Sequence, residues 1–224
     1  MAIESVHVIG SGRVGSAVSA RLREHGVGLG EQGADLVLLC VPDSAISEVA
    51  RDVEPGPWIA HTSGGTPLSA LDPHRRRFSV HPLQTFVLER GPEQLDGAWA
   101  AVSGESDEAL EQGFRLAETL GLRPFELADA DRPLYHAGAV FAASFLVTLH
   151  EAAAELLNTA GAPPEALEPL MRRTMENGFQ PTGPFIRGDS GTIERNLAAI
   201  HERRPELEPL YRHLAAATEE LVAR

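Results

Sequence analysis

The chain of 224 residues contains no lysine, and all 19 of its basic residues are arginines. The absence of lysine excludes the lysine of a phosphate-binding P-loop, a Schiff-base lysine and a lysine general acid. A proton donor in any active site must therefore be a histidine, a tyrosine, a carboxylic acid or a water molecule.

Cysteine, positive charge and long apolar runs are also scarce. Cys40 is the one cysteine and lies in an apolar run, so a disulfide framework is excluded and a core position is expected. The net charge of −13 argues against nucleic-acid or anionic-membrane partners. The apolar stretch around residues 137–149 is shorter than the roughly 20 residues of a membrane span. The N-terminus enters a strand without a signal peptide, so we expect a cytoplasmic protein.

The most informative motif is a short apolar strand, residues 6–9, that leads directly into a Gly-x-Gly-x-x-Gly sequence. The first glycine of such a motif allows a tight turn, the second a close approach to a pyrophosphate, and Gly15 close packing of the following helix. The helix N-terminus then points at the anion. The residues predicted to bind the pyrophosphate are Gly10, Ser11, Gly12, Arg13 and Val14, with an exposed surface arginine as the alternative at position 13.

Predicted strands alternate with predicted helices up to about residue 128. Apolar runs predict strands at 35–41, 58–61, 77–80, 98–102 and 123–127, and helical patterns cover 13–25, 45–53 and 107–120. This alternation predicts an α/β domain with a doubly wound, Rossmann-like parallel sheet. We place the domain boundary near Ala128, which gives domains of residues 1–128 and 129–224.

The second part of the chain shows no strand pattern and predicts an all-α C-terminal domain. Helices are expected at 133–160, 165–177, 192–202 and 206–222. The first of them is apolar nearly all round, so it must be buried on most sides. Burial against a second copy of the chain predicts a homodimer through residues 133–160, and enclosure by the three neighbouring helices is the alternative.

The second strand-helix unit of a complete dinucleotide site is truncated. Only residues 26–34 separate the first helix from the next strand, and a parallel crossover alone needs about a dozen residues. The strand that would carry the adenosine ribose is therefore missing or vestigial. Glu31 stands near the expected place of the ribose-binding acid, and a solvent-exposed loop carboxylate is the alternative.

Polar clusters follow three successive predicted strands, and ligands of open α/β sheets bind beyond the carboxyl ends of strands. The candidate cofactor-binding residues at these ends are Val41, Pro42, Asp43, Thr62, Ser63 and Gly64. His81 follows the third strand and is a candidate for proton transfer, because imidazole titrates near neutral pH. Turn and cap chemistry is the alternative for each cluster.

The helical part adds two further candidate catalytic residues. His136 lies near the start of the long helix, where an imidazole can donate to a carbonyl or accept a proton. Arg187 can bind a substrate carboxylate through two hydrogen bonds. The alternatives are a packed histidine between the domains and an ion pair of Arg187 with Asp189, which can itself cap the next helix.

A metal site is not predicted. His61, His81 and His136 are the side chains from which one could be built, but they lack the spacing of metal ligands.

Together these motifs resemble a bacterial family of Rossmann-like proteins with a C-terminal helical domain of unknown function, whose members are described as NADP oxidoreductases. The matching elements in this chain are Gly10-Ser11-Gly12-x-x-Gly15, Val41-Pro42-Asp43-x-x-Ile46, His61-Thr62-Ser63-Gly64, His81-Pro82-Leu83-Gln84-Thr85-Phe86, Arg132-x-x-Tyr135-His136, Pro169-Leu170, Thr182-Gly183-Pro184, Arg187-Gly188-Asp189 and Leu210-Tyr211.

The family is similar to prephenate dehydrogenases, pyrroline-5-carboxylate reductases and 6-phosphogluconate dehydrogenases. This resemblance implies a helical domain that dimerises and closes over the nicotinamide end of the cofactor. His81-Pro82 resembles a His-Pro segment of prephenate dehydrogenases, whose histidine contacts the reacting hydroxyl.

Three functions follow from these observations. The first is an NAD(P)-dependent oxidoreductase that uses NADP or NAD and acts on a small anionic metabolite. The second is a non-catalytic sensor or scaffold that has lost dinucleotide binding, which the truncated second strand favours. The third is a protein that binds a smaller anion at the glycine turn. The sequence fixes neither the substrate nor the choice between NAD and NADP.

Overall fold

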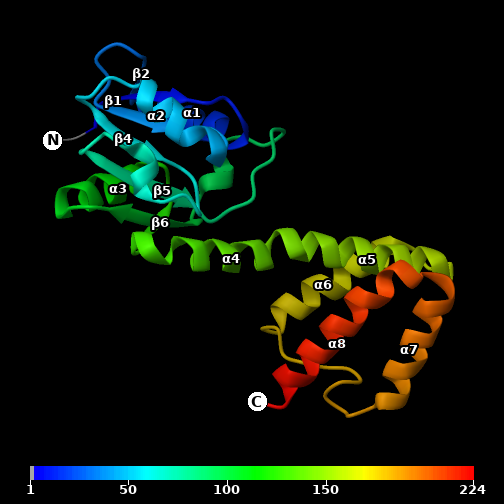
Figure 1. Cartoon of the computed structure of the whole chain (residues 1–224). Coiled ribbons are helices and arrows are strands. Elements are labelled where there is room, and N and C mark those ends of the chain that lie inside the picture. The colour runs from blue at the N-terminus through cyan, green and yellow to red at the C-terminus, as the bar shows by residue number, and fades with distance from the viewer. Residues whose placement is uncertain (1–2) are drawn as a thin grey trace. The chain divides into compact units, whose positions relative to one another are not determined.

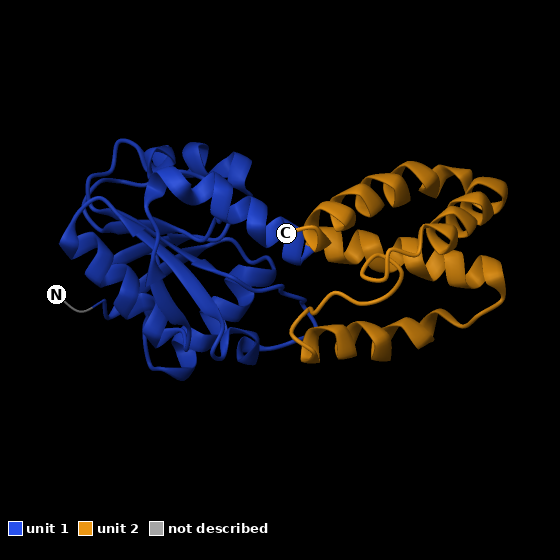
Figure 2. Ribbon diagram, turned by 90° about the horizontal axis from the view of Figure 1, so that it is seen from below, with its two compact units in different colours: residues 1–143 blue, residues 144–224 orange. Residues whose placement is uncertain are grey.

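The computed structural model of the chain describes residues 3–224 and divides into two compact units, which meet between Ala143 and Ser144 (Figure 2). The division falls later than the boundary expected near Ala128. The reason is that helix α4, Arg132–Ala142, is tied to the sheet of the first unit by hydrogen bonds from Arg132 and Tyr135.

The first unit is built on one sheet (Figure 1). Its strands are β1 Ser5–Ile9, β2 Gly28–Leu29, β3 Leu36–Leu39, β4 Trp58–His61, β5 Arg77–Pro82, β6 Trp99–Gly104 and β7 Arg123–Glu126. Its α-helices are α1 Arg13–Glu24, α2 Ile46–Asp52, α3 Asp107–Thr119 and α4. The strand order is β2-β1-β3-β4-β5-β6-β7, so the Rossmann-like α/β prediction is confirmed.

The prediction of an entirely parallel sheet is wrong at one pair. β5 and β6 are antiparallel, with His81 opposite Ala101, and β7 then runs parallel to β6. The connection of residues 83–98 contains only the short 3₁₀ segment Pro92–Leu95. For β6 to run parallel to β5, the chain would first have to cross back along the length of the strands, usually through a helix. Without that helix, the chain re-enters the sheet from the end at which β5 leaves it.

Alternating side chains give each face of the sheet its own core. Residues such as Val6, Leu38 and Phe78 pack in one cluster with α1 and α3. Their strand neighbours, among them Leu39 and Ile59, pack in a second cluster with α2 and its surroundings. This period of two is what strands covered on both faces require.

The truncation of the second strand-helix unit is confirmed. β2 has two residues and pairs with Ser5 and Val6, at the start of β1 and away from the glycine turn. Glu31 is exposed beyond β2. It borders a cavity of about 620 Å³ with His7 and Val37 on the sheet face next to α2.

The helix predicted over residues 133–160 is two helices. α4 ends at Ala142 and α5, Ser144–Ala160, begins after Ala143, whose φ of −117° and ψ of −74° depart from helical values. Neither proline nor glycine stands at this point. By length and composition, residues 129–160 could cross a membrane, which the shorter stretch 137–149 did not suggest.

The second unit is helical throughout its regular structure, as predicted. It contains α5, α6 Leu167–Glu176, α7 Ser190–Arg203 and α8 Glu208–Val222. Leu167, Ile200 and Ala215 are buried, whereas Val147 and Leu170 are 62% exposed and Phe179 is 70% exposed. Much of the apolar surface of this unit is therefore open within a single chain.

Candidate functional site

The glycine turn has the geometry that its sequence predicts. Gly10 has a φ of +110°, and a β-carbon there would lie 2.4 Å from the carbonyl oxygen of Cys40. A β-carbon at Gly15 would lie 2.0 Å from the carbonyl oxygen of Gly10, so α1 packs directly on the turn. Gly12, the residue before α1, has open space around its missing β-carbon. The first and third glycines are thus needed by the protein, and the second leaves room for a ligand.

The remaining predicted phosphate-binding residues surround this turn. Ser11 and Arg13 are exposed and Val14 is half-buried at the start of α1. The carbonyl oxygen of Ser11 accepts a hydrogen bond from the Ser16 hydroxyl at 2.9 Å. The first backbone N–H groups of α1 have no partner within the helix and point out of its N-terminus, where Gly12 leaves open space.

The polar residues after β3 and β4 lie at the same edge of the sheet as the turn. Val41 and Pro42 follow β3, and Asp43 begins a short 3₁₀ segment. Thr62 follows β4, and its backbone N–H donates to the carbonyl oxygen of Leu39 at 3.2 Å. Asp43 lies near enough for its negative charge to favour the charged forms of His81 and Arg132, which are described next.

Ser63 organises the tight turn after β4. Its hydroxyl oxygen accepts from the backbone N–H groups of Gly65 and Thr66 at 3.3 and 3.0 Å, and it shares a 2.8 Å hydrogen bond with the Thr66 hydroxyl. These bonds are the turn chemistry given as the alternative for Ser63. The turn also sets the backbone of Gly64 at the position where two histidines meet.

His81 and His136 lie on either side of Gly64. A β-carbon at Gly64 would be 2.8 Å from Nε2 of His81 and 2.7 Å from Cδ2 of His136. The two ring centroids are 6.3 Å apart. Both imidazoles can approach the backbone this closely because residue 64 has no side chain. The structure therefore brings together two of the three predicted catalytic residues, from β5 and from the first turns of α4.

His81 is held by Tyr135 and is neutral. Its Nδ1 lies 2.8 Å from the Tyr135 hydroxyl. Burial, with the nearby charge of Arg132, lowers the pKa of His81 to about 4. Burial also raises the pKa of Tyr135 to about 12, so the phenol keeps its proton. A neutral imidazole of this kind can donate to a substrate oxygen or accept a proton from it.

Arg132 fastens the start of α4 to the sheet. Its side chain is fully buried. The guanidinium donates to the hydroxyls of Ser79 at 2.5 Å and Ser103 at 3.0 Å, and to the carbonyl oxygen of Thr66 at 2.8 Å. A further bond runs to the carbonyl oxygen of Ser63. Arg132 thus fixes α4, the turn at residues 63–66 and the β5–β6 pair in one arrangement.

His61 lies behind this cluster and is not open to a ligand. It is fully buried, its Nδ1 accepts from the backbone N–H of Ser63 at 3.2 Å, and burial lowers its pKa to about 3. Among residues 3–224 no group of three potential metal ligands comes together.

Arg187, the third predicted catalytic residue, belongs to the second unit and is exposed in the loop before α7. Its neighbour Asp189 accepts from the backbone N–H of Thr192 at 3.0 Å and from the Thr192 hydroxyl at 2.7 Å. Asp189 is therefore the cap of α7.

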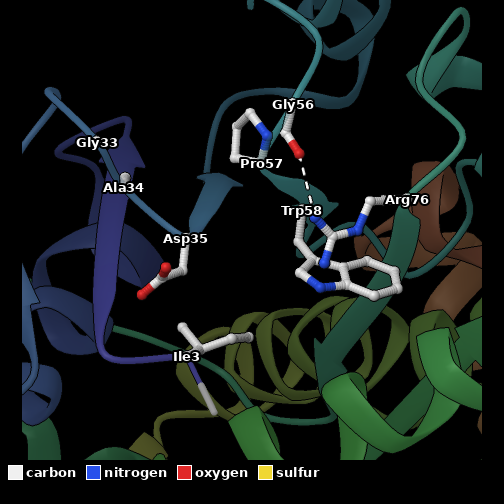
Figure 3. Close-up of a pocket in the computed structure, with 8 residues that line it drawn as sticks. All are labelled: Ile3, Gly33, Ala34, Asp35, Gly56, Pro57, Trp58 and Arg76. Carbon is white, nitrogen blue, oxygen red and sulfur yellow. Dashed lines mark hydrogen bonds between the residues drawn. The ribbon is translucent and has the colours of Figure 1, made fainter. Parts of the chain in front are cut away.

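A separate pocket of about 240 Å³ lies at the opposite edge of the sheet, at the amino ends of the strands (Figure 3). In it the guanidinium of Arg76 lies 4.6 Å from the ring centroid of Trp58 and donates to the carbonyl oxygen of Gly56 at 3.2 Å. Asp35 is held by three hydrogen bonds from Glu4 and Ser5. Because the Arg76 and Asp35 side chains are already paired within the protein, we assign this pocket a structural role and no ligand.

Solved structures with similar folds cover nearly the whole chain. "Putative NADP oxidoreductase BF3122" from Bacteroides fragilis has a TM-score of 0.82 and 22% identity, over 97% of this chain and 98% of that one. Protein TM1727 from Thermotoga maritima has a TM-score of 0.78 and 22% identity, over the same shares. A 1-pyrroline-5-carboxylate reductase from Streptococcus pyogenes has a TM-score of 0.62 and 16% identity, over 97% and 99%.

The expected family resemblance is confirmed by a family model. No curated protein matches the chain. The model described as "Domain of unknown function (DUF2520)" matches residues 98–218, which include β6, β7, α4 and most of the helical second unit. The chain therefore belongs to the DUF2520 family.

Proposed function

We propose that the chain is an NAD(P)-dependent oxidoreductase that acts on a small anionic metabolite. The observation that carries the proposal is the pair of imidazoles of His81 and His136 on either side of Gly64, at the sheet edge that also holds the glycine turn. Proton transfer next to an anion-binding helix N-terminus is what a dehydrogenase or reductase requires.

The residues of the turn fit the pyrophosphate of a dinucleotide. Gly12 has open space where a side chain would stand, and the free N–H groups at the start of α1 can donate to phosphate oxygens. Val41–Asp43 and Thr62–Gly64 would border the ribose and nicotinamide. When bound, the nicotinamide supplies hydride transfer, and the side chains of the protein supply binding and proton transfer.

His81 and His136 take the proton-transfer roles in this proposal. His81 is neutral at pH 7 because its pKa is lowered to about 4. Its ring can therefore hold a substrate oxygen by hydrogen bonding without charging. A carboxylate of the substrate would be bound by an arginine, and Arg187 is the residue that the sequence suggests.

The short β2 leaves the adenosine side of the site open. Glu31 could accept from a ribose hydroxyl, although β2 pairs only with the start of β1. The same observation favours the second candidate, a sensor or scaffold that keeps the fold without binding a dinucleotide. NAD and NADP are distinguished by the experiment below.

Isothermal calorimetry with NADPH and NADH tests the proposal. We expect one of them to bind with micromolar affinity, and the Gly12→Val variant to lose this binding while staying folded, because the new side chain would enter open space. Gly191→Val, the same substitution in the first turn of α7, is the matched control. Absence of binding of both nucleotides to the folded wild-type protein would favour the sensor or single-anion candidates.

The role of His136 is tested by His136→Ala. We expect turnover of a substrate found by nicotinamide absorbance screening to be abolished while NADPH affinity changes little. Unchanged turnover would remove His136 from the mechanism.

We also propose that the protein is a soluble, cytoplasmic homodimer assembled through residues 133–160, and the exposed apolar side chains of α4 and α5 support the interface. Leu134 is 78% exposed and Val147 is 62% exposed within one chain, and surfaces of this kind mark interfaces. Light scattering after gel filtration without detergent should give the mass of a dimer, and Val147→Glu should give a monomer. Leu221→Glu, at an exposed leucine of α8, is the control. A wild-type monomer, or a protein that requires detergent, would contradict the assembly.

A further inference from the structure

The reversal of the chain at β6 brings two side chains to the edge of the sheet where β5 ends. Because β6 is antiparallel to β5 and β7 is parallel to β6, both later strands begin at this edge. Their first residues, Trp99 and Arg123, are partners in the register. The backbone N–H of Leu83, just after β5, donates to the carbonyl oxygen of Trp99 at 2.7 Å.

Aromatic rings connect Trp99 to the histidine pair. The ring centroid of Trp99 lies 6.2 Å from that of Phe125, which lies 6.0 Å from that of Tyr135. The Tyr135 ring is 5.5 Å from the His81 ring. All of these pairs have edge-to-face geometry, which aromatic rings favour. A continuous aromatic surface thus runs from an indole that is 52% exposed to the proposed proton-transfer residue.

Arg123 places a positive charge at the outer end of this surface. Its guanidinium lies over the backbone of Gly97, with Nη2 3.6 Å from the position of a β-carbon there, and the side chain is exposed. Within the described part of the chain, Arg123 has no ion-pair partner. It lies two residues before Phe125, whose partner Ala101 is opposite His81, so one step of about 7 Å along the strands separates the two rows.

We propose that Trp99 and Arg123 form a substrate subsite for an aromatic or planar apolar carboxylate. Arg123, in place of Arg187, would bind the carboxylate through two hydrogen bonds, and the indole would pack against the apolar part of the ligand. The step of about 7 Å between the two rows of residues places the carboxylate about one ring length from the part of the substrate that contacts His81. The inference rests on the proposed function, because it takes His81 to contact the reacting end of the substrate.

Calorimetry with three small probes tests the subsite on the full-length protein. 3-Phenylpropanoate carries both a ring and a carboxylate, propanoate lacks the ring, and 3-phenylpropanamide lacks the charge. We expect 3-phenylpropanoate to bind at least about tenfold more tightly than either of the others. Arg123→Gln should reduce its affinity to that of the amide, and Trp99→Leu to that of propanoate. Arg51→Gln, at an exposed arginine of α2, should change nothing.

Equal affinities of 3-phenylpropanoate and its amide, or equal effects of Arg123→Gln and Arg51→Gln, would overturn the subsite. The same variants are titrated with NADPH. If Arg123→Gln weakens NADPH as much as 3-phenylpropanoate, the arginine serves the cofactor and the inference fails. If NADPH binds to no variant while the probes follow the expected pattern, the proposed oxidoreductase function fails and the carboxylate subsite stands.

Discussion

The hydroxyl of Tyr135 lies 2.8 Å from Nδ1 of His81, and this contact joins α4 to the carboxyl end of β5. The two residues are held by different elements, so the bond exists only when the helix is seated on the sheet. The hydroxyl keeps its proton because burial raises the pKa of Tyr135 to about 12. A hydroxyl that keeps its proton can donate to Nδ1, and we expect this direction, which places the hydrogen of His81 on Nε2, beside Gly64.

Tyr135→Phe should remove the preference of His81 for the tautomer with its hydrogen on Nε2. In the wild type at pH 7.5 we expect the ¹⁵N NMR shifts of His81 to show an unprotonated Nδ1 and a protonated Nε2. Without the phenol donor the two tautomers should mix, and stability should fall by about 1 kcal/mol. Tyr211→Phe, which removes an exposed hydroxyl that accepts from Asn196, is the control. An unchanged His81 spectrum in the Tyr135 variant would contradict the expected direction of the hydrogen bond.

Acid should destabilise the protein through its buried histidines. The folded-state pKa of His81 is lowered from 6.5 to about 4. Between these values the unfolded chain binds more protons than the folded one, so stability is present above pH 6.5 and is lost as the pH falls towards 4. The loss from His81 is on the order of 3 kcal/mol, and His61 adds to it in the same direction.

Urea unfolding at pH 7.5, 5.5 and 4.5 measures this loss. His81→Gln should flatten the pH dependence, whereas His213→Gln, at an exposed histidine of α8, should not. A wild-type stability that is constant between pH 7.5 and 4.5 would contradict the neutral, buried state of His81.

Arg132→Met should be among the most destabilising substitutions in the first unit. The change leaves two hydroxyls and two carbonyl oxygens without their donor. Removal of one side of a buried polar network costs about 3 kcal/mol or more. Arg115→Met, which removes an exposed pair with Glu111, should cost less than about 1 kcal/mol. Similar midpoints in urea for the two variants would show that the Arg132 network contributes little.

The sequence predicts those parts of the fold that depend on local signals. The glycine turn, the alternation of strands and helices and the truncated second unit follow from residue spacing and segment length. The reversal at β6 does not follow from local signals, because the sequence of a strand does not determine whether it pairs parallel or antiparallel. The missing helix between residues 83 and 98 was the available signal. Trp99 and Arg123 carry no predicted role for the same reason, because only the reversed strand brings them to the functional edge.

The site was predictable in part for the same reason. His81 and Gly64 follow strands, and strand ends of a parallel sheet converge. Arg132 stands in a sequence motif but has no predicted role, because a buried arginine is rare and its burial depends on Ser79 and Ser103 becoming neighbours on β5 and β6. Tyr135 was quoted in a motif but given no role. The spacing of 132, 135 and 136, which shares one helix face, was the signal that could have found them.

Gly64→Ala tests whether the two histidine rings pack against residue 64, and Gly138→Ala in α4 serves as the comparison. The new methyl group would lie 2.8 Å from His81 Nε2 and 2.7 Å from His136 Cδ2, so at least one ring must move. We expect a loss of about 1–3 kcal/mol and shifted NMR signals of both imidazoles, as overpacking requires. Gly138→Ala, at a position of α4 with open space around it, should leave both signals unchanged and stabilise the helix slightly. If Gly64→Ala leaves both histidine signals in place, the rings do not pack against this backbone in solution. The candidate site would then lose the feature that brings its two imidazoles together.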